Sequence, residues 1–195
     1  MSAEDALVSE FVRGFLAFEI DDPIVKKKLT NMQTLAMETG ADLKLVEPEN
    51  IHMTMRFLGD VTLNTVEKVF AEMQKIQFKP FPVQLKGLGV FPSLSYPRVL
   101  WAGIAIGAEQ LQNVFEQIEP RIESLGFPPD KNAFSPHLTI ARVRSARNKA
   151  GLADLVTKNA KYDFGSIEAR CLRLKRSQLT PRGPIYSTLK EYCPK

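Results

Sequence analysis

Two segments of one pattern decide the fold that we expect, His52-Met53-Thr54-Met55 and His137-Leu138-Thr139-Ile140. The chain has 195 residues and two histidines, and each histidine begins one of these segments. Each is followed two positions later by a threonine, with apolar residues at the positions between and after. The copies lie 85 positions apart, which suggests two similar lobes that each donate one His-Thr pair to a shared cleft.

Both segments fall in predicted strands, where side chains alternate between two faces. Each histidine then shares a face with its threonine, while the apolar residues between them point into a core. A single histidine in a strand is most often a buried residue bonded to a neighbour, but two matched copies favour a functional pair. A metal site is a weaker interpretation, because no third histidine, nearby cysteine pair or acidic residue within the motifs completes a ligand set.

A pair of this kind suits acid–base catalysis at a phosphate. Histidine titrates near pH ~6.5, so one imidazole can accept a proton while the other donates one. The hydroxyls of Thr54 and Thr139 can hold the non-bridging oxygens at each side. This chemistry requires no metal, and a nearby arginine would stabilise the extra negative charge of the transition state.

Two arginines follow the motifs at different offsets. Arg56 lies four positions after His52, and an unbroken strand would place it on the same face as that histidine. Arg142 lies five positions after His137, so it needs a bulge or a strand end to reach the site. Strand geometry alone therefore favours Arg56.

The composition is that of one ordinary soluble domain, with 44% hydrophobic and 25% charged residues and a net charge of +4. The longest apolar segment is far shorter than the ~20 residues of a membrane span. The first twenty residues lack the basic start and apolar run of a secretory signal, so we expect a cytoplasmic protein. The mild positive charge permits a nucleic-acid or phosphate partner without requiring one. Cys171 and Cys193 could pair in principle, but intracellular thiols are usually reduced, and we treat both as structural or incidental.

Strands and helices mix without strict alternation, which predicts an α+β fold with antiparallel sheets. Strands are expected at 11–20, 43–46, 51–58, 83–90, 98–106, 137–143, about 164–178 and 185–192. Helices are expected at 24–37, from 62 or 64 to 76, at 111–125 and at 148–159. Asp22 is the expected N-cap of the first helix with Pro23 at N1, and Thr62 or Asn64 caps the second. Pro120 is expected to kink the third helix.

The two motifs, taken as residues 52–59 and 135–142, resemble the paired HxTx signatures of the 2H phosphoesterases. Within that superfamily the chain is similar to the RNA 2′,3′-cyclic phosphodiesterases, also called 2′-5′ RNA ligases, and above all to archaeal-type members. Residues 89–92, 97–103 and 179–186 also resemble family segments, so the similarity extends over about 11–192. The resemblance implies a single domain, 1–195, of two pseudo-symmetric lobes. Their antiparallel sheets are expected to face a central cleft, with the helices outside.

The resemblance also implies a reaction. The family opens a terminal 2′,3′-cyclic phosphate on RNA to leave a 2′-phosphate, without ATP or metal, and many members run a 2′-5′ ligation in the test tube. By resemblance, His52 donates a proton to the leaving 3′ oxygen and His137 is the base that activates water. Thr54 and Thr139 would bind the phosphate. No cofactor is expected.

The family arginine falls on Arg142, and here the resemblance takes precedence over strand geometry because strand ends bend. The aromatic residue after the first motif falls on Phe57, which either stacks on a base or ribose or packs in the core. Arg56 has no role by resemblance, and a solvated strand residue is an equally good interpretation of it. The basic cluster comprises Arg142, Arg144, Arg147 and Lys149. It either follows an RNA backbone or forms a solvated loop and helix start.

The expected partners are RNA ends, including tRNA fragments, or nucleotides, with no membrane and with the protein acting as a monomer. One alternative is a nucleotide- or RNA-binding module with little turnover, against which the intact His-Thr pairs argue. A second alternative is the same chemistry on a cyclic nucleotide, a 2′-5′ oligonucleotide or ADP-ribose 1″,2″-cyclic phosphate. These substrates share the cyclic or 2′-linked phosphate, so the sequence does not separate them.

Overall fold

The computed structural model describes residues 11–130, 133–181 and 183–194. The strands are β1 (Phe11–Glu19), β2 (Leu43–Leu45), β3 (His52–Thr62), β4 (Phe81–Ser93), β5 (Tyr96–Ile106), β6 (His137–Val143), β7 (Asp163–Ala169), β8 (Leu172–Thr180) and β9 (Gly183–Tyr192). The helices are α2 (Pro23–Glu38), α3 (Leu63–Met73), α4 (Ala108–Ser124) and α5 (Lys149–Lys158), with a 3₁₀ turn at Pro48–Asn50. Within the described residues these strands form one antiparallel sheet, in the order β7-β4-β5-β6-β3-β1-β8-β9, and β2 also pairs with β6.

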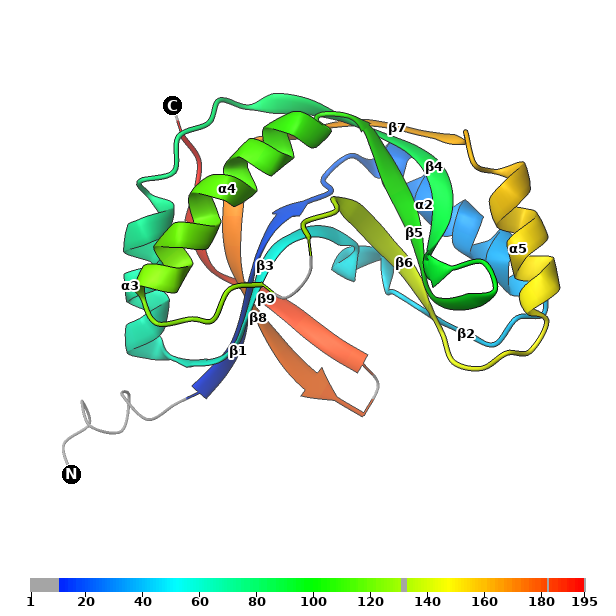
Figure 1. The fold of residues 1–195 in the computed structure, drawn as a ribbon, viewed down its shortest axis with the longest axis horizontal. Helices are drawn as coiled ribbons and strands as arrows, with labels where there is room; N and C mark the ends of the chain where they lie inside the picture. Colours follow the sequence, from blue (N-terminus) through cyan, green and yellow to red (C-terminus); the bar gives the residue numbers. More distant parts are fainter. Residues whose placement is uncertain (1–10, 131–132, 182, 195) are drawn as a thin grey trace.

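The sheet consists of two related halves that meet at the motif strands. β3, β1, β8 and β9 follow one another in the first half, and β6, β5, β4 and β7 follow one another in the second. β3 and β6 join the halves through a single register pair, Met53 with Leu138. α3 and α4 lie at one side of the molecule and α2 and α5 at the other (Figure 1). The predicted α+β fold with two lobes is therefore confirmed, and hydrogen bonding joins the sheets of the two lobes into one.

The apolar residues of the two motifs lie in the core. Met53, Met55, Leu138 and Ile140 are each at most 2% exposed, as the alternation of strand faces predicts. Burial of these four side chains fixes which face of β3 and β6 turns away from the core, and the histidines and threonines lie on that face.

The predicted N-caps of the first two helices are confirmed. The Asp22 carboxylate accepts hydrogen bonds from the backbone N–H groups of Ile24 and Val25, at 2.8 Å each, and caps α2. Thr62 rather than Asn64 caps α3, because its hydroxyl accepts the Thr65 N–H. Pro120 lies inside α4, which runs on to Ser124, and the kink expected there stays a prediction. Within the described residues, no helix is long and apolar enough to cross a bilayer.

The strand predicted at 164–178 is wrong. This segment contains two strands: β7 ends before Arg170 and β8 begins after Cys171. They lie in opposite halves of the sheet, where β7 pairs with β4 and β8 pairs with β1. No glycine or proline lies between the two strands, so the sequence pattern there is that of one continuous strand. The loop predicted at 91–97 is also shorter, since β4 continues to Ser93 and β5 begins at Tyr96.

The two cysteines form a disulfide, so the expectation of reduced thiols is wrong. Leu172 and Tyr192 are register partners on β8 and β9, and the next positions outward are Cys171 and Cys193. The pairing of these strands therefore brings the two sulfur atoms together, with the Cα atoms 4.3 Å apart. The disulfide ties the link between β7 and β8 to the end of β9.

Candidate active site

A cavity of about 420 Å³ opens where the motif strands of the two halves meet. It is lined by residues of β2, β3, β4, β5, β6, β9 and the turn after β2: Lys44, Leu45, Val46, Glu47, Asn50, His52, Thr54, Phe57, Phe91, Val99, His137, Thr139, Arg142, Gly183, Pro184 and Tyr186. The list includes every residue of the expected site: His52, His137, Thr54, Thr139, Arg142 and Phe57. The structure thus brings together all the side chains that the two motifs and their resemblance predicted. Arg56 does not line this cavity.

A β-bulge in each motif strand explains which residue reaches the cavity. On β3, Leu16 of β1 pairs with Arg56 and Ala17 pairs with Thr54, so Met55 has no register partner on that side. The extra residue reverses the alternation of faces beyond it. Phe57 therefore lies on the cavity side with Thr54, and Arg56 on the other.

The second motif has the same bulge at the equivalent position. Leu100 of β5 pairs with Ala141 and Trp101 pairs with Thr139, which leaves Ile140 without a register partner there. Arg142 consequently faces the cavity although it lies five positions after the histidine. The bulge that Arg142 was expected to need is present, and the preference for Arg56 from an unbroken strand is wrong.

Arg56 is a buried structural residue. The residue is 7% exposed, and its Nε donates to Glu119 of α4 at 2.8 Å. Its other nitrogens donate to the carbonyl oxygens of Phe57 and Pro128. Arg56 therefore holds α4 and the segment after it against β3, so it is neither a solvated residue nor a cavity residue.

The two imidazoles are oriented by the same backbone contact. Nδ1 of His52 lies 2.7 Å from the carbonyl oxygen of Asn50, and Nδ1 of His137 lies 2.7 Å from that of Ser135. A carbonyl oxygen only accepts, so Nδ1 carries the hydrogen in both rings and Nε2 is left for the cavity. In the neutral His52 ring, Nε2 accepts a hydrogen bond from the Thr54 hydroxyl at 2.9 Å.

The surroundings of the two rings differ. The centroid of His52 lies 4.7 Å from that of Phe15 and 5.2 Å from that of Tyr186. Burial lowers the pKa of His52 to about 4, and the positive charge of Lys175 adds to this effect, whereas the bond to Asn50 opposes it. His52 is therefore neutral at pH 7 when the cavity holds no anion.

The ring of His137 has a different aromatic neighbour. Its centroid lies 5.0 Å from that of Phe91, in an edge-on arrangement, and 6.5 Å from that of Trp101. The peptide bond between Phe91 and Pro92 is cis. Phe91 thus occupies, beside His137, a place comparable to that of the aromatic rings beside His52.

Several cavity residues were not predicted. Phe91 and Tyr186 lie within the segments 89–92 and 179–186 that resemble the family, so a signal was present but no role was attached to it. Asn50 is 7% exposed, and its side chain donates to the carbonyl oxygen of Pro184 at 2.9 Å, which ties the turn before the first motif to β9. No sequence pattern marked Lys44.

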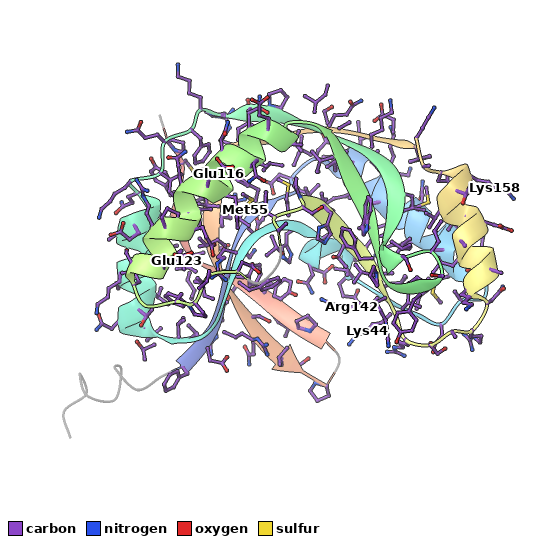
Figure 2. The ribbon with its side chains drawn as sticks, in the orientation of Figure 1. Lys44, Met55, Glu116, Glu123, Arg142 and Lys158 are labelled. Atoms are coloured by element: carbon purple, nitrogen blue, oxygen red, sulfur yellow. A yellow bond between two sulfur atoms is a disulfide. The ribbon has the colours of Figure 1, made fainter. Side chains whose placement is uncertain are left out.

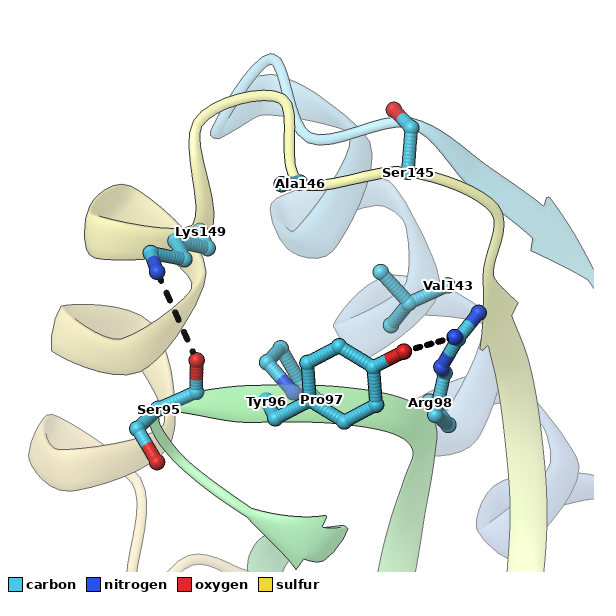
Figure 3. A pocket seen from close by; sticks show the side chains of 8 residues that line it. All are labelled: Ser95, Tyr96, Pro97, Arg98, Val143, Ser145, Ala146 and Lys149. Carbon is cyan, nitrogen blue, oxygen red and sulfur yellow. Dashed lines mark hydrogen bonds between the residues drawn. The ribbon is translucent and has the colours of Figure 1, made fainter.

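A second cavity of about 210 Å³ lies at the tip of the β4–β5 hairpin, and its lining residues are Ser95, Tyr96, Pro97, Arg98, Val143, Ser145, Ala146 and Lys149 (Figure 3). Arg98 lies over the Tyr96 ring, 4.5 Å from its centroid, and donates to the Tyr96 hydroxyl. The predicted basic cluster is therefore divided, because Arg142 lines the first cavity and Lys149 the second.

Comparisons with known proteins agree with this geometry. The family described as LigT-like phosphoesterase matches residues 20–101 and again residues 105–186. The chain belongs to this family. The second matched range begins and ends 85 residues after the first, which is the spacing of the two histidines.

The chain is also similar to individual LigT-like phosphoesterases. It is 39% identical to the RNA 2′,3′-cyclic phosphodiesterase of Aeropyrum pernix over 84% of this chain and 93% of that protein. It is 38% identical to the protein of the same name from Methanocaldococcus jannaschii, over 93% of this chain and all of that protein. The predicted archaeal-type resemblance is thereby confirmed.

Solved structures have the same fold. The crystal structure of TT0787 from Thermus thermophilus covers 93% of this chain and 97% of its own, with a TM-score of 0.76 and 26% identity. The structure of E. coli LigT complexed with 3′-AMP covers 94% of this chain and 98% of its own, with a TM-score of 0.78 and 20% identity. The second likeness concerns the fold alone.

Proposed function

We propose that this protein is an RNA 2′,3′-cyclic phosphodiesterase whose two lobes form one domain around one active-site cleft. It would convert a terminal 2′,3′-cyclic phosphate to a 2′-phosphate and a free 3′-hydroxyl. The names of the relatives supply the substrate class. The observation that carries the chemistry is that His52 and His137 line one cavity while each commits Nδ1 to a backbone carbonyl. Both Nε2 atoms are then left to act on one phosphate, and that of His52 is bonded to the Thr54 hydroxyl until a substrate binds.

In the proposed reaction, a water oxygen bonds to phosphorus as the bond from phosphorus to the 3′ oxygen breaks. Nε2 of His137 takes a proton from the water, and Nε2 of His52 gives a proton to the leaving 3′ oxygen. The bond from phosphorus to the 2′ oxygen is retained, so the product is a 2′-phosphate. The two motifs lie on adjoining strands of different halves, which supports an arrangement with one histidine on each side of the phosphate.

Three further side chains would bind the reacting group. The hydroxyls of Thr54 and Thr139 share the cavity face with the histidines. That of Thr139 can donate to a non-bridging oxygen, and that of Thr54 can do so once Nε2 of His52 is protonated and no longer accepts from it. Arg142 brings a permanent positive charge to the same cavity, where it would stabilise the charge of the pentacoordinate transition state. Phe57 is 61% exposed at the edge of the cavity, which favours a stacking role over the core-packing interpretation.

Because the pKa of His52 is low, the substrate must also promote protonation of this histidine. A proton donor must carry its proton before the reaction, but His52 is neutral in the free site because burial lowers its pKa to about 4. An anionic phosphate beside Nε2 favours the charged imidazole and raises this pKa. We therefore infer that His52 becomes protonated when the substrate binds, so that binding of the phosphate creates the proton donor that the reaction needs.

The proposal includes two properties of the family reaction. The first is independence from metal: the described residues gather three candidate metal ligands only at Cys171, Glu191 and Cys193, where both thiols are in the disulfide. The second is 2′-5′ ligation. If a 5′-hydroxyl replaces water, the same two proton transfers give a 2′-5′ linkage, since the bond to the 2′ oxygen is kept. Action as a monomer in the cytoplasm on fragments such as those of tRNA stays a prediction.

The test is product analysis with an RNA oligonucleotide that ends in a 2′,3′-cyclic phosphate, incubated in EDTA. We expect a 2′-phosphate product, with losses of about 10²–10⁴-fold in His52→Ala and in His137→Ala. Lys158→Gln, on the exposed surface of α5, serves as a control. Full activity in either histidine variant would contradict the mechanism. Tight product binding without turnover would favour a binding module, and turnover confined to mononucleotides would favour a small substrate.

A further inference from the structure

The second half of the cavity carries a positive charge that neither motif supplies. Lys44 lies on β2, and its register partner on β6 is Arg142. Both side chains are exposed and both line the cavity. Figure 2 shows their ends next to each other at the concave side of the molecule. Like charges directly opposite each other in an antiparallel pair repel, so this pair is most favourable when an anion lies beside it.

Arg144 extends the pair outward. Its N–H donates to the carbonyl oxygen of Asp42 at 2.9 Å, so the pairing of the β2 and β6 segments continues past Val143. Alternation of faces then places the Arg144 side chain on the same face as Arg142. Arg144 therefore lies about 6.6–6.8 Å beyond Arg142 along the strand, outside the lining of the cavity, whereas Lys44 belongs to that lining.

Asp42 lies opposite Arg144 in the register of the two strands, but among the described residues none of the three cations is held in an ion pair. Within the part of the chain that the structure describes, no ion pair includes Lys44, Arg142 or Arg144. Glu47 is the one carboxylate among the described cavity residues, and it forms no such pair with them. In the first half, by contrast, Arg56 is paired with Glu119. The surplus of positive charge therefore lies at the rim of the second half.

We propose that Lys44 and Arg144, which together with Arg142 are here called the cationic row, bind the RNA strand that precedes the reacting end. This inference rests on the proposed function. A cyclic phosphate stands at the 3′ end of its strand, so every other phosphate of the RNA lies on the 5′ side. With the reacting phosphate between the histidines and beside Arg142, Lys44 lies next to the first inner phosphate and Arg144 next to the second.

The cationic row would set substrate length preference. A nucleoside 2′,3′-cyclic phosphate has no inner phosphate and gains nothing from Lys44 or Arg144. A dinucleotide with a cyclic end gains the contact with Lys44, and a trinucleotide gains the contact with Arg144 as well. The enzyme would therefore prefer oligonucleotides, with a preference that weakens as salt rises.

The experiment measures kcat/KM for the mononucleoside, dinucleotide and trinucleotide 2′,3′-cyclic phosphates with Lys44→Gln and Arg144→Gln. We expect Lys44→Gln to lower the dinucleotide-to-mononucleoside ratio about fivefold, and Arg144→Gln to lower the trinucleotide-to-dinucleotide ratio by about the same factor. For the trinucleotide, each variant should also reduce the slope of log(kcat/KM) against log(salt) by about 0.7.

Two matched controls remove a positive charge elsewhere. Arg98 precedes Val99, the β5 partner of Arg142, so Arg98→Gln removes a charge from the opposite face of the same strand region. Lys158→Gln removes one from α5, whose end lies away from Arg142 in Figure 2. Both controls should leave the length ratios unchanged.

Three outcomes would contradict the proposed role of the cationic row. These are unchanged ratios in both test variants, an equal loss in Arg98→Gln, and a wild-type enzyme without length preference. Failure of the proposed function is a different result, namely no ring opening of any of the three substrates. In that case, binding of a trinucleotide with a 2′-phosphate end, measured by fluorescence anisotropy, still compares Lys44→Gln and Arg144→Gln with the two controls.

Discussion

The two halves of the site use one backbone device for different chemistry. In each half, a histidine bonds to the carbonyl oxygen two residues before it, and a bulge then brings the fifth residue after the histidine to the cavity. That fifth residue is Phe57 in the first half and Arg142 in the second. The backbone thus fixes where functional groups lie, whereas the side chain at each equivalent position determines what its half can bind.

The two halves also differ in how deeply their equivalent residues are buried. His52 lies against two aromatic rings, and burial lowers its pKa to about 4. The residue before the fifth position is Arg56 in the first half, where it forms a buried ion pair, and the buried Ala141 in the second. The first half therefore buries its histidine and pairs its arginine with a carboxylate inside the protein. The second half exposes its arginine to the cleft.

Among the residues that differ between the halves, substitutions at the fifth positions should change the kinetics most. Arg142→Gln should lower kcat on the RNA substrate about 10²–10³-fold, because charge stabilisation in the transition state is lost. Phe57→Ala should raise KM about tenfold with little change in kcat, because a stacked base binds ground state and transition state alike. Steady-state kinetics of both variants checks this. Loss of kcat in Phe57→Ala with only a KM effect in Arg142→Gln would contradict the division between the halves.

The next effect concerns stability and Arg56. Arg56→Met keeps much of the volume but leaves Glu119 partly buried without its partner, so the free energy of unfolding should fall by about 3 kcal/mol. Arg170 pairs with Glu168 at an exposed site, and Arg170→Met should cost under about 1 kcal/mol. Urea unfolding measures both. Similar small losses in the two variants would mean that Arg56 does not brace the first half.

The smallest effect is a shift in titration. In the free protein the His52 ring should titrate near pH 4 rather than near 6.5, and an added nucleoside 2′-phosphate, the product end of the proposed reaction, should raise the midpoint. Because the unfolded chain binds this proton at the higher pH, the free energy of unfolding should fall as pH drops from about 6.5 towards about 4. NMR of labelled imidazole follows the midpoint. A midpoint near 6.5, or one that a saturating nucleoside 2′-phosphate leaves unmoved, would contradict this account of His52.

Local patterns predicted the parts of the fold that depend on near neighbours. The Asp22 and Thr62 caps, the motif strands and the faces of the two histidines follow from residues a few positions apart. The bulges do not, because Met55 and Ile140 look like ordinary strand residues and only the register with β1 and β5 leaves them without a partner. The family resemblance nevertheless selected Arg142 correctly as a cavity residue.

The remaining errors and omissions arise from contacts between distant residues. Arg56 finds Glu119 on α4, 63 positions away, and no local signal marks such a pair. The β8–β9 register places Cys171 beside Cys193. Lys44 reaches the cavity only because a three-residue strand pairs with β6. Strand pairing over long sequence distances is not encoded in composition or periodicity, and these features became visible only in the structure.

The division of labour between His52 and His137 is tested most directly by a substrate whose leaving atom needs no proton. In a 2′,3′-cyclic phosphate with sulfur at the 3′ bridging position, the bond from phosphorus to sulfur breaks to release a thiolate, which is a far weaker base than an alkoxide. His52→Ala should regain most of its lost activity with this substrate, while His137→Ala stays about 10²–10⁴-fold slow. Thiol release, measured by a colour reaction, gives the rates. Rescue of His137→Ala in place of His52→Ala, or of neither variant, would contradict the assignment of acid to the first half and base to the second.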